Sequence, residues 1–265
     1  MRIPKTIHYC WFGEAPLRPL HEHCLATWRD RLPGYEIVVW NDANGPWHLP
    51  HAVQLRRFKR WTMLSDYVRL HALLTRGGIY LDTDVEVVAP LDPFLEDACF
   101  LGFQQKNVER AAVCNAVVGA VPGHPYIADS IAALQYSLRR HLKPFYGIKV
   151  MNLVLYEYGL ARYGRQTLRD VTLYEQEIFY PFNSNEPPLA PAALPRESVA
   201  LHHWCGDWHK RRTLRANLAS LEFKLWRLPG AAGSGLRDLL RGPASRPPGF
   251  RANWRRAWAH RDHAG

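Results

Sequence analysis

The sequence predicts a single α/β domain with a mainly parallel sheet, followed by a helical, basic extension. Through the first 209 residues, apolar runs of strand length alternate with segments that repeat apolar residues at helical spacing. This alternation is typical of a sheet flanked by helices. The length of 265 residues suits one such domain. The net charge of +10 lies entirely after residue 209, which separates the extension from the rest of the chain.

The predicted elements of the first half are bounded by clear stop signals. Runs rich in β-branched and aromatic residues indicate strands, and Gly77-Gly78 ends a helix because glycine readily adopts the conformation that stops one. In chain order we expect a strand at 3–12, a helix at 17–32, a strand at 35–40, a helix at 62–76 and a strand at 79–88.

The second half continues the same pattern and then changes character. We expect strands at 98–103 and 112–121, helices from 122 to about 141 and at 150–163, and strands near 171–182 and at 199–204. After these, leucines spaced four, three, four and three residues apart form one apolar helix stripe, at Leu214, Leu218, Leu221, Leu225 and Leu228. The rest is rich in Gly, Pro, Ala and Arg, which favours a loose tail. We therefore divide the chain into residues 1–209 and 210–265.

Composition limits the cellular setting. The five cysteines are odd in number and form no C-x-x-C, which disfavours a disulfide framework or a structural zinc site and favours a reducing cytoplasm. The apolar run at 7–12 is too brief for a secretory signal, and no apolar run approaches the roughly 20 residues that span a bilayer.

The basic extension suggests an anionic partner. Residues 210–265 hold 13 Lys and Arg against three Asp and Glu. We expect this segment to rest on an anionic membrane surface, which would make the protein cytoplasmic and peripheral to the membrane. The leucine stripe is equally consistent with an ordinary core helix, so this expectation needs a direct test.

The strongest chemical signal is one cluster of acidic and basic side chains. Ser65, Asp66 and Arg69 share a face of the helix predicted at 62–76, and Tyr80, Asp82 and Asp84 alternate onto one side of the next strand. Ligands in open α/β sheets bind beyond the carboxyl ends of the strands. Carboxylates there suit Mg²⁺ or Mn²⁺, which stabilises the charge of a departing diphosphate.

The whole string, S-D-x-x-R, a helix, then G-G-x-Y-x-D-x-D, resembles a known family. It is similar to the DxD sugar-binding region of bacterial capsule and lipopolysaccharide glycosyltransferases, which fungal initiating mannosyltransferases and the catalytic domains of large clostridial glucosylating toxins share. The resemblance is close over 65–88 and weaker at 7–13 and 202–208. It implies a GT-A fold, a nucleotide-sugar donor, most simply a UDP-sugar, a Mn²⁺ or Mg²⁺ cofactor, and retention of anomeric configuration.

The resemblance also implies roles for individual residues. Trp11 would stack on the donor base, Asp66 and Arg69, beside Ser65, would hold the donor sugar, and Tyr80 and Asp82 would hold the ribose. Asn115 would contact the sugar and Trp208 a phosphate. The candidate catalytic residues are Asp66, Arg69, Asp82 and Asp84, and the candidate metal ligands are Asp82, Asp84 and His203.

The metal ligand near residue 202 and the acceptor side of the site are less well defined by the sequence. His202 and His203 are adjacent, so on a strand they face opposite sides and at most one reaches the metal; we expect His203. Relatives often carry Gly-Pro before a short helix, whereas this chain has Gly147-Ile148, which leaves the acceptor side open.

Two other classes of protein fit parts of the sequence. A metal-dependent phosphoesterase or nucleotide-sugar hydrolase would use similar ligands, although two-metal sites want more carboxylates and histidines. A basic nucleic-acid-binding protein would suit Trp254, Arg255, Arg256 and Trp258, but the basic charge is confined to the tail and no nucleic-acid-binding motif is present. We therefore expect sugar transfer to a polysaccharide or lipid-linked acceptor in surface polysaccharide biosynthesis, with no nucleic-acid partner.

Overall fold

The computed structural model describes residues 1–108, 112–140, 147–183 and 193–205. The chain divides into two units, Met1–Arg227 and Leu228–Gly265, and every described residue belongs to the first. The expected basic extension at 210–265 therefore lies outside the described residues. Within the described ranges, no helix has the length and hydropathy needed to cross a bilayer.

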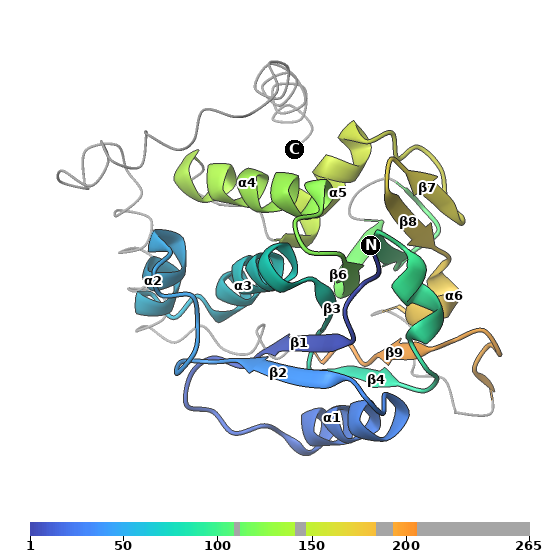
Figure 1. The fold of residues 1–265 in the computed structure, drawn as a ribbon, viewed down its shortest axis with the longest axis horizontal. Coiled ribbons are helices and arrows are strands. Elements are labelled where there is room, and N and C mark those ends of the chain that lie inside the picture. The colour runs from blue at the N-terminus through green and yellow to red at the C-terminus, as the bar shows by residue number, and fades with distance from the viewer. Residues whose placement is uncertain (109–111, 141–146, 184–192, 206–265) are drawn as a thin grey trace. The chain divides into compact units, whose positions relative to one another are not determined.

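A seven-stranded mixed sheet forms the centre of the fold (Figure 1). Five of its strands run in one direction, while β6 and β7 run the opposite way. This arrangement confirms the predicted α/β class with a mainly parallel sheet. In spatial order the strands are β2 (Glu36–Trp40), β1 (Thr6–Cys10), β3 (Gly78–Leu81), β6 (Val113–Ala120), β5 (Cys99–Phe103), β8 (Val171–Tyr174) and β7 (Gln166–Leu168).

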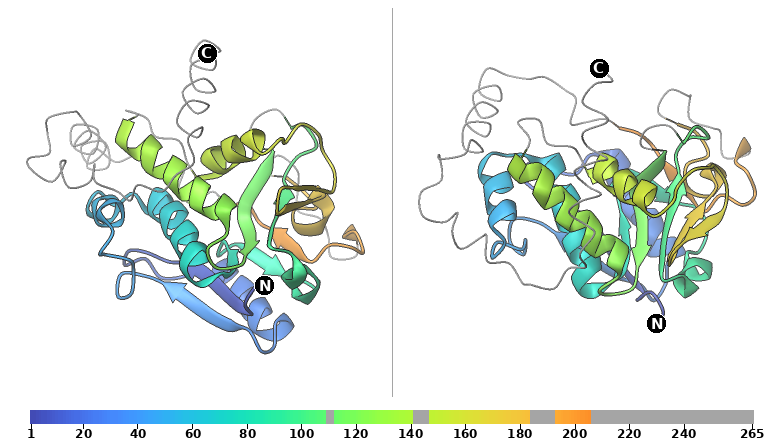
Figure 2. Two further views of the ribbon diagram at one scale, coloured as in Figure 1. Left: turned by 45° about the horizontal axis from the view of Figure 1, so that its top comes forward. Right: turned by 90° about the horizontal axis from the view of Figure 1, so that it is seen from above.

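Helices cover both faces of the sheet (Figure 2). On one face, α3 (Trp61–Arg76) packs against β1, β3 and β6, with α2 (Pro50–Arg57), α4 (Pro125–Arg140) and α5 (Gly147–Glu157) beside it. On the other face lie α1 (Pro19–Arg31), α6 (Gln176–Phe179) and a 3₁₀ turn at Asp92–Glu96. Apolar side chains of α1, the 3₁₀ turn and α6 form one buried core cluster with the strands on this second face, and α3 buries its own apolar side chains on the first face.

A second, two-stranded sheet pairs β4 (Val85–Val87) with the distant β9 (Ala200–His202). The sequence predicted one strand over 79–88, and this expectation is wrong. The chain leaves the main sheet after Leu81, and the N–H of Val85 donates to the carbonyl of Asp82 at 3.0 Å, which closes a turn. The sequence does not reveal that the strand is interrupted after Leu81, because both short strands are buried and therefore apolar. β3 lies within the main sheet, and β4 packs against α1.

Other differences are shifts of boundaries or short elements. The helix predicted at 150–163 is α5, which begins at Gly147 and ends at Glu157. The strand predicted near 171–182 is β8 followed by α6. The short elements α2 and β7 are additions that the sequence analysis did not predict.

Two long-range hydrogen bonds fix the strands that carry the candidate site. His8 Nε2 lies 2.8 Å from the carbonyl oxygen of Gly77, which joins β1 to the entry of β3. A side chain at Gly78 would place its Cβ 2.6 Å from the carbonyl oxygen of Thr6, and φ there is +103°, so only glycine fits. On the other side, Trp28 Nε1 donates to the carbonyl oxygen of Val85 at 2.7 Å and ties α1 to β4.

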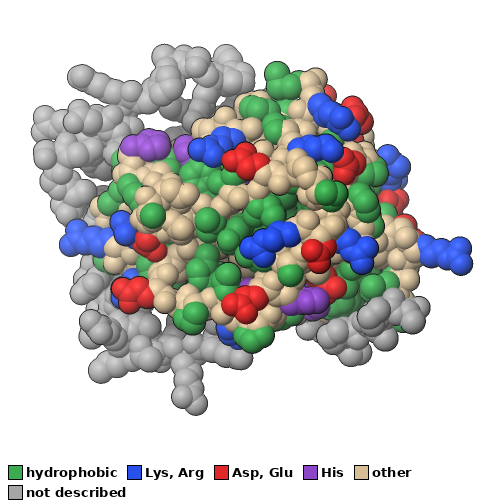
Figure 3. Space-filling view, turned by 60° about the horizontal axis from the view of Figure 1, so that its bottom comes forward, with side chains coloured by type: hydrophobic (Ala, Val, Ile, Leu, Met, Phe, Trp, Pro, Cys, Tyr) green, Lys and Arg blue, Asp and Glu red, His purple; other side chains and the backbone are tan. Residues whose placement is uncertain are grey.

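The surface of the described part carries mixed charge. Basic and acidic side chains are interspersed with apolar ones on the face shown in Figure 3. This fits the balance of 21 basic and 21 acidic residues in the first 209 positions.

Candidate functional site

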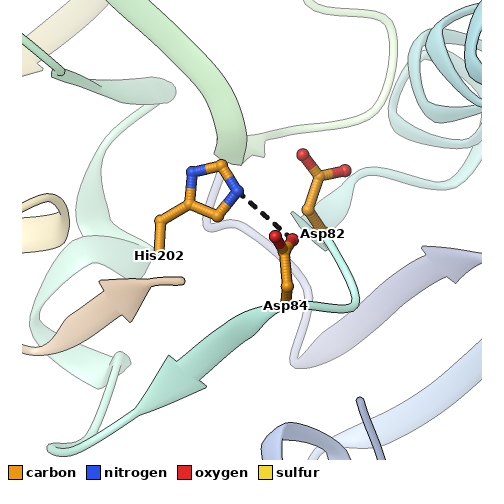
Figure 4. Close-up of side chains that lie close together, drawn as sticks. All are labelled: Asp82, Asp84 and His202. Atoms are coloured by element: carbon orange, nitrogen blue, oxygen red, sulfur yellow. Dashed lines mark hydrogen bonds and ion pairs between the residues drawn. The ribbon is translucent and has the colours of Figure 1, made fainter. Parts of the chain in front are cut away.

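Two aspartates and a histidine converge where β3 ends. The ligand atoms of Asp82, Asp84 and His202 all lie within 4.8 Å of one another (Figure 4). Asp82 and Asp84 come from the turn between β3 and β4, and His202 comes from the end of β9. The turn directs both carboxylates to one place, which replaces the strand alternation expected from the sequence. The expected position beyond the carboxyl end of a strand is confirmed.

The structure corrects the choice between the two adjacent histidines. His202 Nε2 lies 3.2 Å from Asp84 Oδ1, whereas His203 Nε2 lies 2.9 Å from Glu86 Oε2. The antiparallel pairing of β9 with β4 places His202 opposite Val85, so the imidazole of His202 and not that of His203 reaches the aspartates. Strand alternation could exclude one histidine, but only the long-range register selects which.

Asp84 is held through both of its carboxylate oxygens. Besides His202, it accepts a hydrogen bond from the backbone N–H of Cys205, 3.0 Å from Oδ2. Burial alone would raise the pKa of Asp84, but these two hydrogen bonds outweigh it and hold the pKa well below its usual range. Burial would likewise lower the pKa of His202, and the bond to Asp84 raises it to about 10. Without a cation the pair is therefore an imidazolium beside a carboxylate.

Asp82 is held by the buried guanidinium of Arg69. Arg69 Nη2 donates to Asp82 Oδ1 at 2.9 Å, and Arg69 Nη1 donates to the backbone carbonyl of Asn115. The guanidinium lies over the ring of Tyr80, 4.2 Å from its centroid, and the hydroxyl of Tyr80 donates to Asp82 Oδ1 at 3.2 Å. Burial raises the pKa of Asp82, although the charge of Arg69 opposes this.

Asp66 and Asn115 extend this network across the sheet. Asn115 Nδ2 donates to Asp66 Oδ1 at 3.2 Å, and the backbone N–H of Gly147 donates to Asp66 Oδ2 at 2.8 Å. Arg69 Nη2 lies 3.5 Å from the same Oδ1. The structure thus brings together five of the residues that the sequence singled out, Asp66, Arg69, Tyr80, Asp82 and Asn115, and adds a contact from the backbone of Gly147 in α5.

The remaining candidates lie farther from this network or outside the described residues. Trp11 is partly buried; its Nε1 donates to the carbonyl oxygen of Ala15 at 2.7 Å, and its ring meets that of His21 edge-on at 4.9 Å. Ser65 is half-buried, and its carbonyl oxygen faces the Cys10 thiol. Trp208 lies outside the described ranges, so its predicted phosphate contact stays a prediction.

Comparisons with known proteins agree with this geometry. Residues 19–101 match the family described as "Glycosyltransferase sugar-binding region containing DXD motif". The chain is 30% identical over 143 residues to inositol phosphoceramide mannosyltransferase 3 of Schizosaccharomyces pombe, an overlap that covers 50% of this chain and 37% of that protein. It is 28% identical over 149 residues to the mannosyl phosphorylinositol ceramide synthase SUR1 of Saccharomyces cerevisiae, covering 51% and 35%.

More distant similarities include a bacterial protein and one solved structure. The subversion of eukaryotic traffic protein A of Legionella pneumophila is 24% identical over 169 residues, covering 51% of this chain and 26% of that protein. The solved PaToxG glycosyltransferase is 18% identical with a TM-score of 0.49, covering 59% of this chain and 69% of that one. The chain spans well under half the length of these curated relatives.

The family match contains both halves of the predicted string, the helix with Asp66 and Arg69 and the turn with Asp82 and Asp84. The resemblance inferred from the sequence is therefore confirmed. Over residues 19–101 the chain matches the glycosyltransferase family that is defined by a sugar-binding region containing a DXD motif.

Proposed function

We propose that this protein transfers a sugar from a nucleotide-sugar donor to an acceptor hydroxyl, with one divalent cation held by Asp82, Asp84 and His202. The observation that carries the proposal is the convergence of these three ligand atoms within 4.8 Å at the end of β3. Carboxylates on neighbouring, partly buried positions repel each other, and a shared cation removes that cost. The family match over 19–101 supplies the class of reaction.

The donor set fits a divalent cation and favours Mn²⁺ over Mg²⁺. Carboxylates suit both ions, but an imidazole ligand is uncommon for Mg²⁺, which prefers oxygen and keeps several waters. When bound, the ion supplies positive charge that stabilises the diphosphate oxygens as the bond from sugar to phosphate breaks. His202 must then give up the proton it shares with Asp84, so binding is expected to release a proton.

The protein's own residues orient the donor. The guanidinium of Arg69 donates a hydrogen bond to Oδ1 of Asp82, and the hydroxyl of Tyr80 donates to the same oxygen, so the Asp82 carboxylate is held in one orientation. Asp66 presents the remaining lone pairs of a carboxylate already fixed by Asn115 and Gly147, which suits acceptance of hydrogen bonds from sugar hydroxyls. We assign Asp66 and Arg69 to the donor sugar, with Asn115 beside it, and Tyr80 and Asp82 to the ribose.

We assign Trp11 to the donor base. The hydrogen bond to Ala15 and the edge contact with His21 fix the plane of the indole while leaving the ring partly exposed. A fixed aromatic plane that is still accessible can stack on a base with little loss of side-chain entropy. Ser65, half-buried near the start of α3, would border this part of the site.

The acceptor and stereochemistry extend the proposal. The two yeast relatives are named for the transfer of mannose to inositol phosphoceramide or for its product, which favours a hexose donor and a lipid-linked or polysaccharide acceptor in surface glycan biosynthesis. We propose retention of anomeric configuration, which proton NMR of the product tests directly.

We also propose that residues 210–265 rest on anionic membrane lipid. Equal sedimentation of full-length and 1–209 chains with anionic vesicles would contradict that location.

The central experiment is a thermal-shift screen of UDP- and GDP-linked hexoses with and without Mn²⁺. A ligand that binds only the folded chain raises the melting temperature. We expect one donor to give a shift that requires Mn²⁺ and that disappears in Asp84→Ala. If no nucleotide sugar shifts the transition in a Mn²⁺-dependent way, the proposal is wrong. If a donor is hydrolysed but never transferred to any glycan or lipid acceptor, the nucleotide-sugar hydrolase is the better description.

A further inference from the structure

Trp204 has an unusual backbone conformation beside the candidate metal site. Its φ is +51°, in the left-handed region that bulky side chains rarely adopt. Two other non-glycine residues among those described share a positive φ, Lys59 and Arg169, and both are exposed. Trp204 instead is partly buried and lies two residues after His202. Such strain persists only where the surrounding structure holds it, and it gathers at functional sites.

The indole ring of Trp204 is fixed by contacts on several sides. It packs against the imidazole of His202, with the ring centroids 4.0 Å apart and the planes at 42°. The ring of Tyr180 lies 6.1 Å away, and Nε1 of Trp204 donates to the carbonyl oxygen of Phe182 at 3.1 Å. The indole therefore limits the orientations that the His202 imidazole can take.

The backbone turn at Trp204 holds the other side of Asp84. The N–H of His203 donates to the backbone carbonyl of Asp84 at 2.9 Å, which extends the pairing of β9 with β4 by one step. The chain then turns at Trp204, and the next N–H, that of Cys205, donates to Asp84 Oδ2 at 3.0 Å. Asp84 is thus held through Oδ1 by His202, two residues before Trp204, and through Oδ2 by Cys205, the residue directly after Trp204.

We propose that Trp204 is a positioning residue for the metal site: its ring aligns His202, and its left-handed backbone places the Cys205 N–H on Asp84. This inference rests on the proposed function. Residues that orient metal ligands from outside the coordination sphere typically change metal affinity by about 10–100-fold when they are removed. Trp204 acts on both a ligand side chain and a ligand's second oxygen, so we expect an effect within about that range.

The alternative is that Trp204 only fills space in the core. A packing residue would change the melting temperature and leave metal affinity untouched once the protein is folded. The two roles are separated by substitutions that remove the ring alone, the ring together with the backbone strain, or neither. Trp204→Phe keeps a flat ring, Trp204→Ala removes the ring, and Trp204→Gly removes the ring and relieves the left-handed strain.

The experiment measures Mn²⁺ affinity of the full chain by electron paramagnetic resonance, well below the melting temperature of each variant. We expect Trp204→Phe to bind within about threefold of the unaltered protein, and Trp204→Ala to bind roughly 10–100-fold more weakly. Phe103→Leu, in the core on β5, serves as the control for lost packing because its side chain meets Tyr163 and not the cluster. Co²⁺ provides a second readout, because its visible spectrum reports ligand geometry without any assay of activity.

The outcomes separate this inference from the proposed function. If the unaltered protein binds no Mn²⁺, the proposed metal site is wrong and the inference falls with it. If it binds Mn²⁺ and both Trp204→Ala and Trp204→Gly bind it equally well with an unchanged Co²⁺ spectrum, the inference alone is overturned. Should Trp204→Ala not fold, Trp204→Gly and Trp204→Phe still decide, because the inference requires the glycine variant to bind more weakly than the phenylalanine variant.

Discussion

The backbone N–H of Gly147, the first residue of α5, lies 2.8 Å from Oδ2 of Asp66. The two residues are 81 positions apart, and the contact joins α5 to the helix that carries Arg69. The first N–H groups of a helix have no partner within the helix and favour negative charge. Asp66 supplies that partner, so its carboxylate is held in one orientation within the proposed sugar site.

Gly147→Ala should therefore impair donor use. An alanine Cβ would lie 2.6 Å from Asp66 Cγ and 2.7 Å from Oδ1, closer than real contacts allow, so the carboxylate must move. We expect kcat/KM for the donor to fall at least tenfold, which corresponds to about 1.4 kcal/mol of transition-state stabilisation. Steady-state kinetics measure this. Lys149→Ala, on the exposed side of the same turn, should change kcat/KM by less than twofold.

The two adjacent histidines form a matched pair of variants. His202→Ala removes a proposed ligand, and we expect Mn²⁺ affinity measured by calorimetry to fall at least tenfold. His203→Ala removes an imidazole that faces Glu86, and we expect the affinity to stay within about twofold. Equal losses of Mn²⁺ affinity in both variants, or a larger loss in His203→Ala, would contradict His202 as the ligand and would favour His203, the ligand expected from the sequence.

The sequence predicts most of the fold because each main strand and helix has its own local pattern. The runs that became β1, β2, β5 and β6 are apolar and short, and α1, α3 and α4 have helical spacing with clear ends. The cluster of Asp66, Arg69, Tyr80 and Asp82 could be predicted because a tight Gly77-Gly78 turn joins their two elements.

The rest of the site depends on contacts between distant segments. The pairing of β4 with β9 decides that His202, and not His203, meets Asp84. No local pattern encodes that register, because either histidine can face inward on an isolated strand. The contact between Gly147 and Asp66 could not be predicted either. The sequence pattern places the start of α5 three residues later and gives no indication that this helix begins beside Asp66.

Arg69 should contribute to stability as well as to the site. Its side chain is 5% exposed, and its charge faces Asp82 and Asp66. Arg69→Ala would leave these buried carboxylates without their cation, which typically costs about 3–5 kcal/mol. Arg69→Lys keeps a charge but cannot reach both Asp82 and the Asn115 carbonyl with one planar fork, so we expect an intermediate loss.

Urea unfolding of the Arg69 variants measures these losses. Arg56 offers a control, since it forms an ion pair with Asp42 at 2.6 Å in which both side chains are about a third or more exposed. Arg56→Lys should cost less than about 1 kcal/mol, as exposed pairs do. A loss in Arg69→Ala no larger than that of Arg56→Lys would show that the buried network is not a source of stability.

His8 should make the protein less stable in mild acid. Burial lowers the pKa of His8 below 6.5, Arg76 lowers it further, and the bond to the Gly77 carbonyl and the charge of Glu36 oppose this. Trp40 Nε1 lies 3.3 Å from His8 Nδ1 as a donor, so a second proton on the ring would face another N–H. In the window between the lowered pKa and 6.5, the unfolded chain binds more protons than the folded one. The stability from neutral His8 is therefore complete above about pH 6.5 and is lost as the pH falls through that window.

His8→Gln tests this because an amide can accept from Trp40 and donate to Gly77 without titrating. Urea unfolding from pH 7.5 to 5.5 should show a shallower loss of stability in the variant, with about 1–2 kcal/mol less stability at pH 7.5 from imperfect hydrogen bonds. His21, His71 and His124 also have lowered pKa values and add to the pH dependence of both proteins. The contribution of His8 is therefore read from the difference between the stability curves of the unaltered chain and of His8→Gln. His23→Gln, which removes an exposed imidazole, is the control. Parallel curves for His8→Gln and the unaltered chain would mean that the pKa of His8 is the same in the folded and the unfolded protein, and that its role lies only in joining β1 to the entry of β3.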